Sequence, residues 1–454
     1  MSEILSQMAE QAKQIFYNGI NAVDPVAAIM NTIKIKDNKL YIQNQSIHLN
    51  NFNNVYVIGF GKASTAMLNG FAKLAGKFIT KALVITKDGH NIFQDRSLSD
   101  CFSFPVEICL ASHPVPDERG ISVTLKIMSL IKAAKQNDII ICLISGGGSA
   151  LLCQPAENIS LTDMMTTTQL LLNCGATIHE LNCVRKHISK IKGGQLSELA
   201  YPAQICSIIL SDVIGDNLEV ISSGPTVPDP TSYADAGNIL KKYDLLDKIP
   251  ISVKKHFLKH EQDQNYNIRS RNHAVFNKTS NHLIASNAIA LKACEIKAKE
   301  FGYNTLILSD SIQGEARECA VFHAGIIQSV LTRSIPIEKP ACIISGGENT
   351  VTIQGKGKGG RNQEFCLSII PYISDLKNSV VISAGSDGND GPTDAAGGIV
   401  TSETNDTVSR MGLKITDYLN NNDSYHLLKK CGCLLKTGPT NTNVMDIRII
   451  LINQ

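Results

Sequence analysis

The chain has 454 residues, enough for about two domains, and its composition, 43% hydrophobic and 19% charged, excludes a disordered protein. A net charge of +2 gives no general attraction to nucleic acid, and no apolar run reaches the roughly 18 residues of a membrane helix. The 13 cysteines are scattered singly through apolar segments, which is typical of reduced thiols. We therefore expect a cytoplasmic protein that binds neither nucleic acid nor membranes.

Residues 3–33 show a helical pattern, and Val55–Ile58 are predicted to form a strand. The turn after this strand is the first motif that indicates a binding site. The turn reads Gly59-Phe60-Gly61-Lys62-Ala63-Ser64 and leads into a helix. It resembles a dinucleotide fingerprint, but Ser64 stands where the third glycine would be. Lys62 adds a cation beside exposed backbone amides, which favours phosphate or carboxylate binding over a solvated lysine.

A second strand, turn and helix start lies at residues 138–153. Ile139–Ile144 are an unbroken apolar run, which predicts a strand buried on both faces of a parallel sheet. The turn after it consists of Ser145, Gly146, Gly147, Gly148 and Ser149. In such turns several backbone N–H groups point toward one bound anion, so the motif indicates an anion-binding site. The alternative interpretation is a tight strand-to-helix turn that binds no ligand.

Residues 179–192 are predicted to form a helix with a basic stripe, which is either a solvated surface or, with Asn182, Arg185, Ser189 and Lys192, a wall of an anion site. His113 lies in a proline-rich loop and either contacts a ligand or packs that loop. Asp212 follows the predicted strand 205–210. Open α/β sheets place ligand contacts at the carboxyl ends of their strands, so we expect Asp212 either to hold magnesium or to accept a proton.

The polar stretch 227–275 predicts the boundary between two domains, 1–270 and 271–454. In the second domain, Gly346, Gly347 and Glu348 follow an apolar strand and repeat the earlier glycine-rich strand end.

The loop 355–361 nearly matches a Walker A motif but has Arg361-Asn362 in place of Lys-Ser/Thr. With Gly359 and Gly360 it predicts a mobile lid over phosphates, and Arg361 is the candidate to neutralise a phosphoryl group. Asp387 and Asp390 lie in a run with three aspartates in eight residues, which is either a divalent metal site or a polar turn.

Ten motifs occur in chain order: GFGKAS (59–64), SHPVPD (112–117), ISGGGSALL (144–152), VRKHISKIKGG (184–194), LSDVIGD (210–216), SSGPT (222–226), ISGGEN (344–349), GKGGRNQE (357–364), SAGSDGNDGPTDAAG (383–397) and TGPTNTNV (437–444). Together they resemble the class II glycerate kinases with a MOFRL C-terminal domain. The departures are local: Ser112 where Gly is usual, and Asn441 and Met445 where Gly and Asn are usual.

The resemblance implies ATP-dependent phosphorylation of D-glycerate at its 2-hydroxyl, with Mg²⁺. It implies two α/β domains, the first a Rossmann-like three-layer parallel sheet, with the active site in the cleft between them. The family's catalytic lysine falls on Lys62 and its catalytic arginine on Arg361. We expect a monomer or homodimer in which Asp212 orients the acceptor hydroxyl or holds the metal.

Two alternatives remain. An NAD(P)H-dependent hydroxypyruvate reductase would use the turn at 59–64 for a dinucleotide, although the acidic residue expected about 20 positions later is not evident. A non-catalytic sensor would bind glycerate or nucleotide without turnover.

Overall fold

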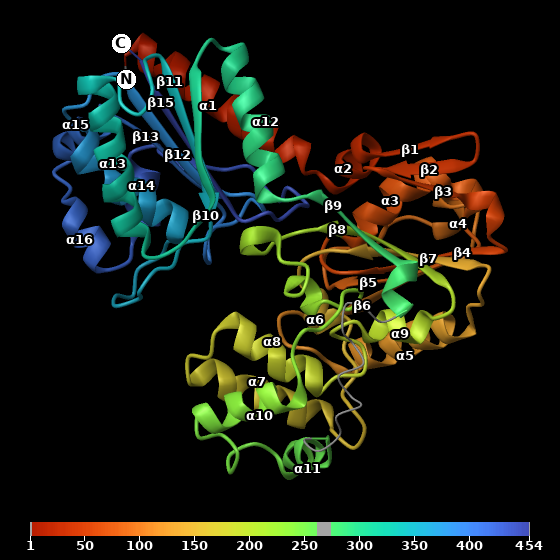
Figure 1. Ribbon diagram of the computed structural model, residues 1–454. Coiled ribbons are helices and arrows are strands. Elements are labelled where there is room, and N and C mark those ends of the chain that lie inside the picture. Colours follow the sequence, from red (N-terminus) through yellow and green to blue (C-terminus); the bar gives the residue numbers. More distant parts are fainter. Residues whose placement is uncertain (1, 261–273, 454) are drawn as a thin grey trace. The chain divides into compact units, whose positions relative to one another are not determined.

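The computed structural model describes residues 2–260 and 274–453 (Figure 1). Its contacts divide the chain into two compact units. Unit 1 contains residues 1–24, 212–215 and 285–454, and unit 2 contains residues 25–211 and 216–284. The division predicted between residues 270 and 271 lies outside the described residues, and the sequence did not indicate that the first helix belongs to unit 1.

Unit 2 is built on a sheet with the strand order β6-β5-β4-β7-β8-β9. The strands are β4 (Asn54–Phe60), β5 (Lys81–Lys87), β6 (Val106–Ala111), β7 (Asp138–Ile144), β8 (Gln204–Leu210) and β9 (Thr279–Ala285). The first five pair in parallel, and every residue of β7 is buried, as its apolar run predicted. The predicted Rossmann-like α/β fold is therefore confirmed. Strand order reverses between β4 and β7, where such sheets bind ligands at the carboxyl ends.

Helices and a small antiparallel sheet complete unit 2. Around the main sheet are α2 (Pro25–Thr32), α3 (Ser64–Ala75), α4 (Leu98–Cys101), α5 (Glu118–Ala133), α6 (Gly148–Leu151) and α9 (Gln195–Ala200), with β1 (Ile33–Lys36), β2 (Lys39–Ile42) and β3 (Gln45–His48). A further group has its own apolar core and comprises α7 (Leu161–Asn173), α8 (Ile178–His187), α10 (Tyr233–Lys242) and α11 (Ile251–His260). A capping box formed by Thr177 and Glu180 fixes the start of α8.

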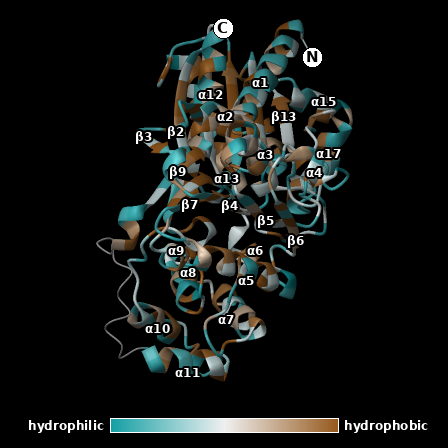
Figure 2. Cartoon of the chain, turned by 90° about the vertical axis from the view of Figure 1, so that its right-hand side faces the viewer, coloured by the Kyte–Doolittle hydropathy of each residue, from teal (hydrophilic) through white to brown (hydrophobic). Residues whose placement is uncertain are grey.

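Unit 1 contains a mixed sheet with the order β10-β11-β15-β12-β13-β14. The strands are β10 (Asn304–Ile312), β11 (Ala341–Gly347), β12 (Ser379–Gly385), β13 (Gly397–Thr401), β14 (Leu434–Leu435) and β15 (Asp446–Ile452). Only β10 and β11 pair in parallel, and β11, β12 and β15 are buried along their whole length. Hydrophobic segments are concentrated in the strands (Figure 2).

Helices cover both faces of this sheet (Figure 1). On one face lie α1 (Glu3–Ala22) and α12 (Asn287–Glu300), and on the other α13 (Ala316–Arg333) and α14 (Arg361–Ile373), followed by α15 (Thr404–Arg410), α16 (Ile415–Asn420) and α17 (Ser424–Lys430). No helix in the described part of the chain has the length and apolar character needed to cross a bilayer.

Close packing against α12 explains why α1 belongs to unit 1. The buried face of α1 includes Met8, Ile15 and Phe16. At Gly19 the two helices approach so closely that a Cβ would lie 2.4 Å from Cys294 Sγ and 3.1 Å from the carbonyl oxygen of Ala290. The absence of a side chain at this point therefore permits the contact.

We expect Gly19→Ala to lower the free energy of unfolding by about 1–2 kcal/mol, because overpacking outweighs the gain in helix propensity. Gly325→Ala is the matched control, since Gly325 lies in α13 with no atom within 4 Å of its added Cβ. The control should stabilise by about 0.5–1 kcal/mol. Chemical denaturation of the two variants measures both effects, and an equal change in both would contradict the packing argument.

Candidate functional site

Two glycine turns meet at the carboxyl ends of the adjacent strands β4 and β7. The backbone amide of Lys62 donates to the carbonyl of Gly146 at 2.8 Å, and the amide of Ala63 donates to Ser145 Oγ at 3.0 Å. Gly61 has φ +123°, and a Cβ there would lie 2.2 Å from Ser145 Oγ. The two turns are thus held together by backbone contacts that require a glycine.

Lys62 and His113 lie beside Gly147, which has φ +83° and precedes α6. A Cβ on Gly147 would be 2.9 Å from the His113 ring and 3.3 Å from Lys62 Cγ. Burial lowers the pKa of His113 to about 4, and Lys62 acts in the same direction, so the imidazole is neutral at pH 7. Lys62 is partly exposed, and its ammonium has no hydrogen bond or ion pair with any residue that the structure describes.

A strained segment packs on the turn at 145–149. Ser222, Ser223 and Gly224 are consecutive left-handed residues with φ of 52°, 61° and 60°. Each non-glycine residue in this conformation costs about 1–2 kcal/mol. The strain is offset by hydrogen bonds, since Ser223 Oγ lies 2.7 Å from Ser149 Oγ and donates to Asn182 Oδ1 at 3.0 Å. The sequence analysis assigned these serines no role, although the SSGPT motif marked them.

The basic stripe of α8 and its continuation is mostly buried. Lys186 pairs with buried Asp229 at 3.4 Å. Lys192 Nζ donates to the carbonyl oxygens of Ser149 (2.7 Å) and Leu152 (3.2 Å), and burial lowers its pKa to about 8. The solvated-surface interpretation is therefore wrong for Lys186 and Lys192, and only Lys190 of these lysines is exposed.

Arg361 begins α14 in unit 1 and is held by two carboxylates. Its Nε and Nη2 donate to Asp446 at 2.8 and 2.9 Å, and its Nη1 lies 3.0 Å from Glu348 Oε1. Burial acts to lower the pKa of Arg361, but Asp446 and Glu348 outweigh it and raise the pKa. The sequence analysis missed Asp446. Its position at the start of the last apolar strand, after a polar loop, was the available signal.

Carboxylates gather around this arginine. Burial raises the pKa of Glu348, and Asp446, Asp212 and Asp387 add to the effect. Asp212 is grouped with unit 1, although it follows β8 by two residues. Asp387 is partly exposed. Within residues 2–260 and 274–453, no three metal-binding side chains are arranged to hold an ion without other ligands.

Asp390 has a structural role. Its two oxygens accept the amides of Asn362 (3.1 Å) and Gln363 (2.8 Å), so it caps the first turn of α14. Burial raises its pKa to about 6. A Cβ at Gly360 would lie 2.3 Å from Asp390 Cγ, so this glycine permits the cap.

The glycine loop before Arg361 is attached to the turn at 421–424. The amides of Gly355, Lys356 and Lys358 donate to the side chains of Asn422, Asn421 and Asp423 at 2.9–3.1 Å. A Cβ at Gly359 would lie 2.2 Å from Ser424 Oγ. The amides of Gly355, Lys356 and Lys358 therefore have partners in this conformation, and the mobile lid over phosphates stays a prediction.

Gly346 and Gly347 are also explained by close packing. A Cβ at Gly346 would lie 1.8 Å from Asn287 Oδ1, and one at Gly347 would lie 2.2 Å from the carbonyl oxygen of Ile312. These contacts account for both glycines without a ligand.

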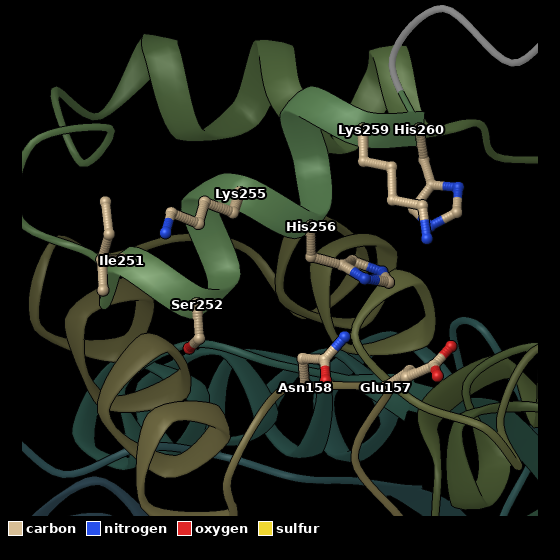
Figure 3. A pocket seen from close by; sticks show the side chains of 8 residues that line it. All are labelled: Glu157, Asn158, Ile251, Ser252, Lys255, His256, Lys259 and His260. Carbon is tan, nitrogen blue, oxygen red and sulfur yellow. The ribbon is translucent and has the colours of Figure 1, made fainter.

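Of two cavities, one is lined by predicted site residues and the other is not. One of about 290 Å³ in unit 1 is lined by Asn349, Gly359, Gly360, Arg361 and Asp390, among others. Another, of about 430 Å³, lies in unit 2 where α11 faces Glu157 and Asn158 (Figure 3). The second contains none of the predicted site residues.

Comparisons with known proteins agree with this arrangement. Residues 11–258 match the domain of unknown function DUF4147, and residues 341–446 match the MOFRL family. The chain is 40% identical to a Pyrococcus horikoshii protein named glycerate 2-kinase, over 99% of this chain and 98% of that protein. The chain belongs to the class II glycerate kinase family.

Two further relatives, one named as a kinase and one as a reductase, also match nearly the whole chain. The crystal structure of glycerate kinase from Thermotoga maritima superposes with a TM-score of 0.86 at 38% identity, over 98% of this chain and all of that chain. An Agrobacterium vitis relative named putative hydroxypyruvate reductase is 37% identical, over 97% of this chain and 93% of that protein.

Beside Arg361, this glycerate kinase family member contains a buried polar network. Arg448 is 1% exposed, its Nη2 donates to Asn349, and its guanidinium lies 5.2 Å from the Phe365 ring centre. His323 is fully buried, with Nδ1 2.7 Å from the carbonyl oxygen of Cys319 and Nε2 2.9 Å from Ser345 Oγ.

Burial lowers the pKa of His323 to about 4, with a contribution from Arg448 in the same direction. Between pH 6.5 and 4 the unfolded chain binds a proton here that the folded chain does not, so stability falls as the pH falls. We expect the melting temperature of His323→Gln to change less between pH 7 and pH 5 than that of the wild type. Exposed His179→Gln is the control, and an unchanged slope in His323→Gln would refute the assignment.

Proposed function

We propose that the chain transfers the γ-phosphoryl group of ATP to the 2-hydroxyl of D-glycerate, giving 2-phosphoglycerate and ADP. The observation that carries the proposal is Lys62, a cation without a partner among the described residues, at the joined glycine turns. Full-length relatives named for this activity support it. An ammonium group left unpaired beside backbone amides is suited to an anionic ligand.

Lys62, Arg361, Asp212 and the turn at 145–149 each have a role in this reaction. The substrate hydroxyl oxygen attacks the γ-phosphorus as the bond to ADP breaks, and the hydroxyl proton passes to Asp212 or to solvent. Lys62 and Arg361 stabilise the negative charge on the transferred group, because phosphoryl transfer depends mainly on positioning and charge neutralisation. In the turn at 145–149 the amides of Ser145 and Gly148 already donate to the carbonyl oxygens of Phe60 and Ser145, so we assign the binding of anionic substrate oxygens to the amides of Gly146 and Gly147.

The residues of unit 1 fit a magnesium ion that arrives with the nucleotide. Asp387 is partly exposed. Burial raises the pKa of Glu348, and the nearby carboxylates add to this effect while Arg361 opposes it, so the net balance around Glu348 favours added positive charge. Mg²⁺ keeps several waters and needs only one or two protein carboxylates besides phosphate oxygens. We propose Asp387 as such a ligand. Asp390 is less suited because both its oxygens cap α14.

A reductase is the second candidate, suggested by the names of two relatives. A dinucleotide would need free amides in the first glycine turn to bind its pyrophosphate. In this turn the amides of Lys62, Ala63 and Ser64 already donate to Gly146 O, Ser145 Oγ and Gly61 O. This geometry favours the kinase.

Lys62→Ala and Arg361→Ala should each lower kcat by about 10²-fold or more, with the fold intact, because each removes charge stabilisation from the transition state. Exposed Lys190→Ala and Lys356→Ala are the matched controls and should keep wild-type turnover. If both residues act on one phosphoryl group, the double variant will lose less than the product of the single effects. Wild-type kcat in either single variant would exclude that residue from the reaction.

Purified protein given D-glycerate, ATP and Mg²⁺ should produce 2-phosphoglycerate, identified by phosphorus NMR, and EDTA should stop turnover. The parallel reaction with hydroxypyruvate and NADH or NADPH should show no loss of absorbance at 340 nm. Reduction of hydroxypyruvate without kinase activity would establish the alternative. Formation of 3-phosphoglycerate would change the assigned hydroxyl.

A further inference from the structure

Arg185 lies on the face of α8 that runs along the chain segment after the glycine turn. Asn182, one turn before it, accepts from Ser223, which contacts Ser149. Ser189, two residues after the end of α8, donates to the carbonyl oxygen of Gln154 at 3.2 Å. Asn182 and Arg185 are three residues apart in α8 and share a helix face, and Arg185 is close enough to Cys153 for the two side chains to interact electrostatically, so Arg185 lies near the segment between Ser149 and Gln154.

Among the residues that the structure describes, none supplies a counter-charge to Arg185. It makes no hydrogen bond or ion pair with any residue in the described ranges 2–260 and 274–453. Burial lowers its pKa, and Cys153 is the one group that acts in the other direction. Burial also raises the pKa of the Cys153 thiol, so this side chain is neutral and supplies no counter-charge.

Arg185 is therefore partly removed from water but still within reach of solvent. It is partly exposed, yet removal from water is the largest influence on its pKa. A partly desolvated cation without a counter-ion is costly, and a bound anion would offset that cost. Lys192, behind the turn, is different because it is fully occupied by the carbonyl oxygens of Ser149 and Leu152.

Two unpaired cations thus flank the turn, with Lys62 beside Gly147 and Arg185 beside Cys153. The proposed acceptor also presents two sites of negative charge, its carboxylate and the phosphoryl group arriving at the neighbouring hydroxyl. A guanidinium matches a planar carboxylate with two parallel hydrogen bonds, whereas an ammonium acts as a point charge suited to a phosphoryl group.

We propose that Arg185 binds the carboxylate of the acceptor substrate and so selects a hydroxy acid over a neutral polyol. The assignment rests on the proposed function, since it takes glycerate as the acceptor. It gives the basic stripe of α8 a defined ligand.

The test compares wild type, Arg185→Met, Arg185→Lys and the exposed control Lys190→Ala. Methionine keeps an apolar side chain of similar length and removes the charge. In Arg185→Met we expect KM for D-glycerate to rise about 10- to 100-fold, the range of a lost hydrogen bond to a charged group. KM for ATP should stay within about threefold, and Arg185→Lys should recover part of the loss. Turnover of glycerol, which lacks the carboxylate, should be equal in wild type and Arg185→Met.

A structural role predicts a different result. If Arg185 only supports the fold, Arg185→Met will melt at a lower temperature and lose activity toward glycerate and glycerol alike. Our proposal requires a melting temperature at or above that of the wild type, because an unpaired desolvated charge is removed. A rise in KM for ATP with KM for glycerate unchanged would reassign Arg185 to a nucleotide phosphate and overturn the proposal.

Calorimetric binding of D-glycerate without ATP separates this inference from the proposed reaction. Wild type that binds glycerate but transfers no phosphoryl group would refute the reaction, and weaker binding by Arg185→Met would still support the carboxylate site. Equal binding by wild type and Arg185→Met would overturn the inference whether or not the reaction occurs.

Discussion

The hydrogen bond from the Lys62 amide to the Gly146 carbonyl is the contact on which the candidate site in unit 2 depends. It joins two turns at the point where strand order reverses, and it uses amides that a dinucleotide-binding turn would leave free. Because the amides of Lys62, Ala63 and Ser64 are already used inside the site, recognition of anions at this first turn falls to the side chain of Lys62. The ammonium of Lys62, which has no partner among the described residues, is therefore the group of this turn that is best suited to bind an anion.

The two units offer opposite electrostatic surroundings. In unit 2, Lys62 and Arg185 have no anionic partner among the described residues. In unit 1, Arg361 is already paired with Asp446 and Glu348, and further carboxylates lie close enough to raise the pKa of Glu348. The first environment favours an anionic ligand, whereas the carboxylates of the second favour added positive charge.

Sequence reasoning was most successful where the signal was local. The apolar run of β7, the strand-turn-helix units and the α/β class were predicted because buried parallel strands and glycine turns have distinctive patterns. It was least informative where a feature depends on a distant contact. The glycines at 355–360 suggested a phosphate loop, and they also permit approach of the segment 421–424 and Asp390, which no local pattern reveals. Asp446 and the left-handed serines at 222–223 were missed for the same reason.

The assignment of α1 to unit 1 has a consequence for biosynthesis. The apolar face of this helix, with Met8, Ile15 and Phe16, leaves the ribosome long before α12 and β15, the elements it packs against. Chains are made from the amino terminus, and unit 2 can fold as soon as its own residues have emerged. The hydrophobic face of α1 therefore stays uncovered until α12 and β15 have been synthesised.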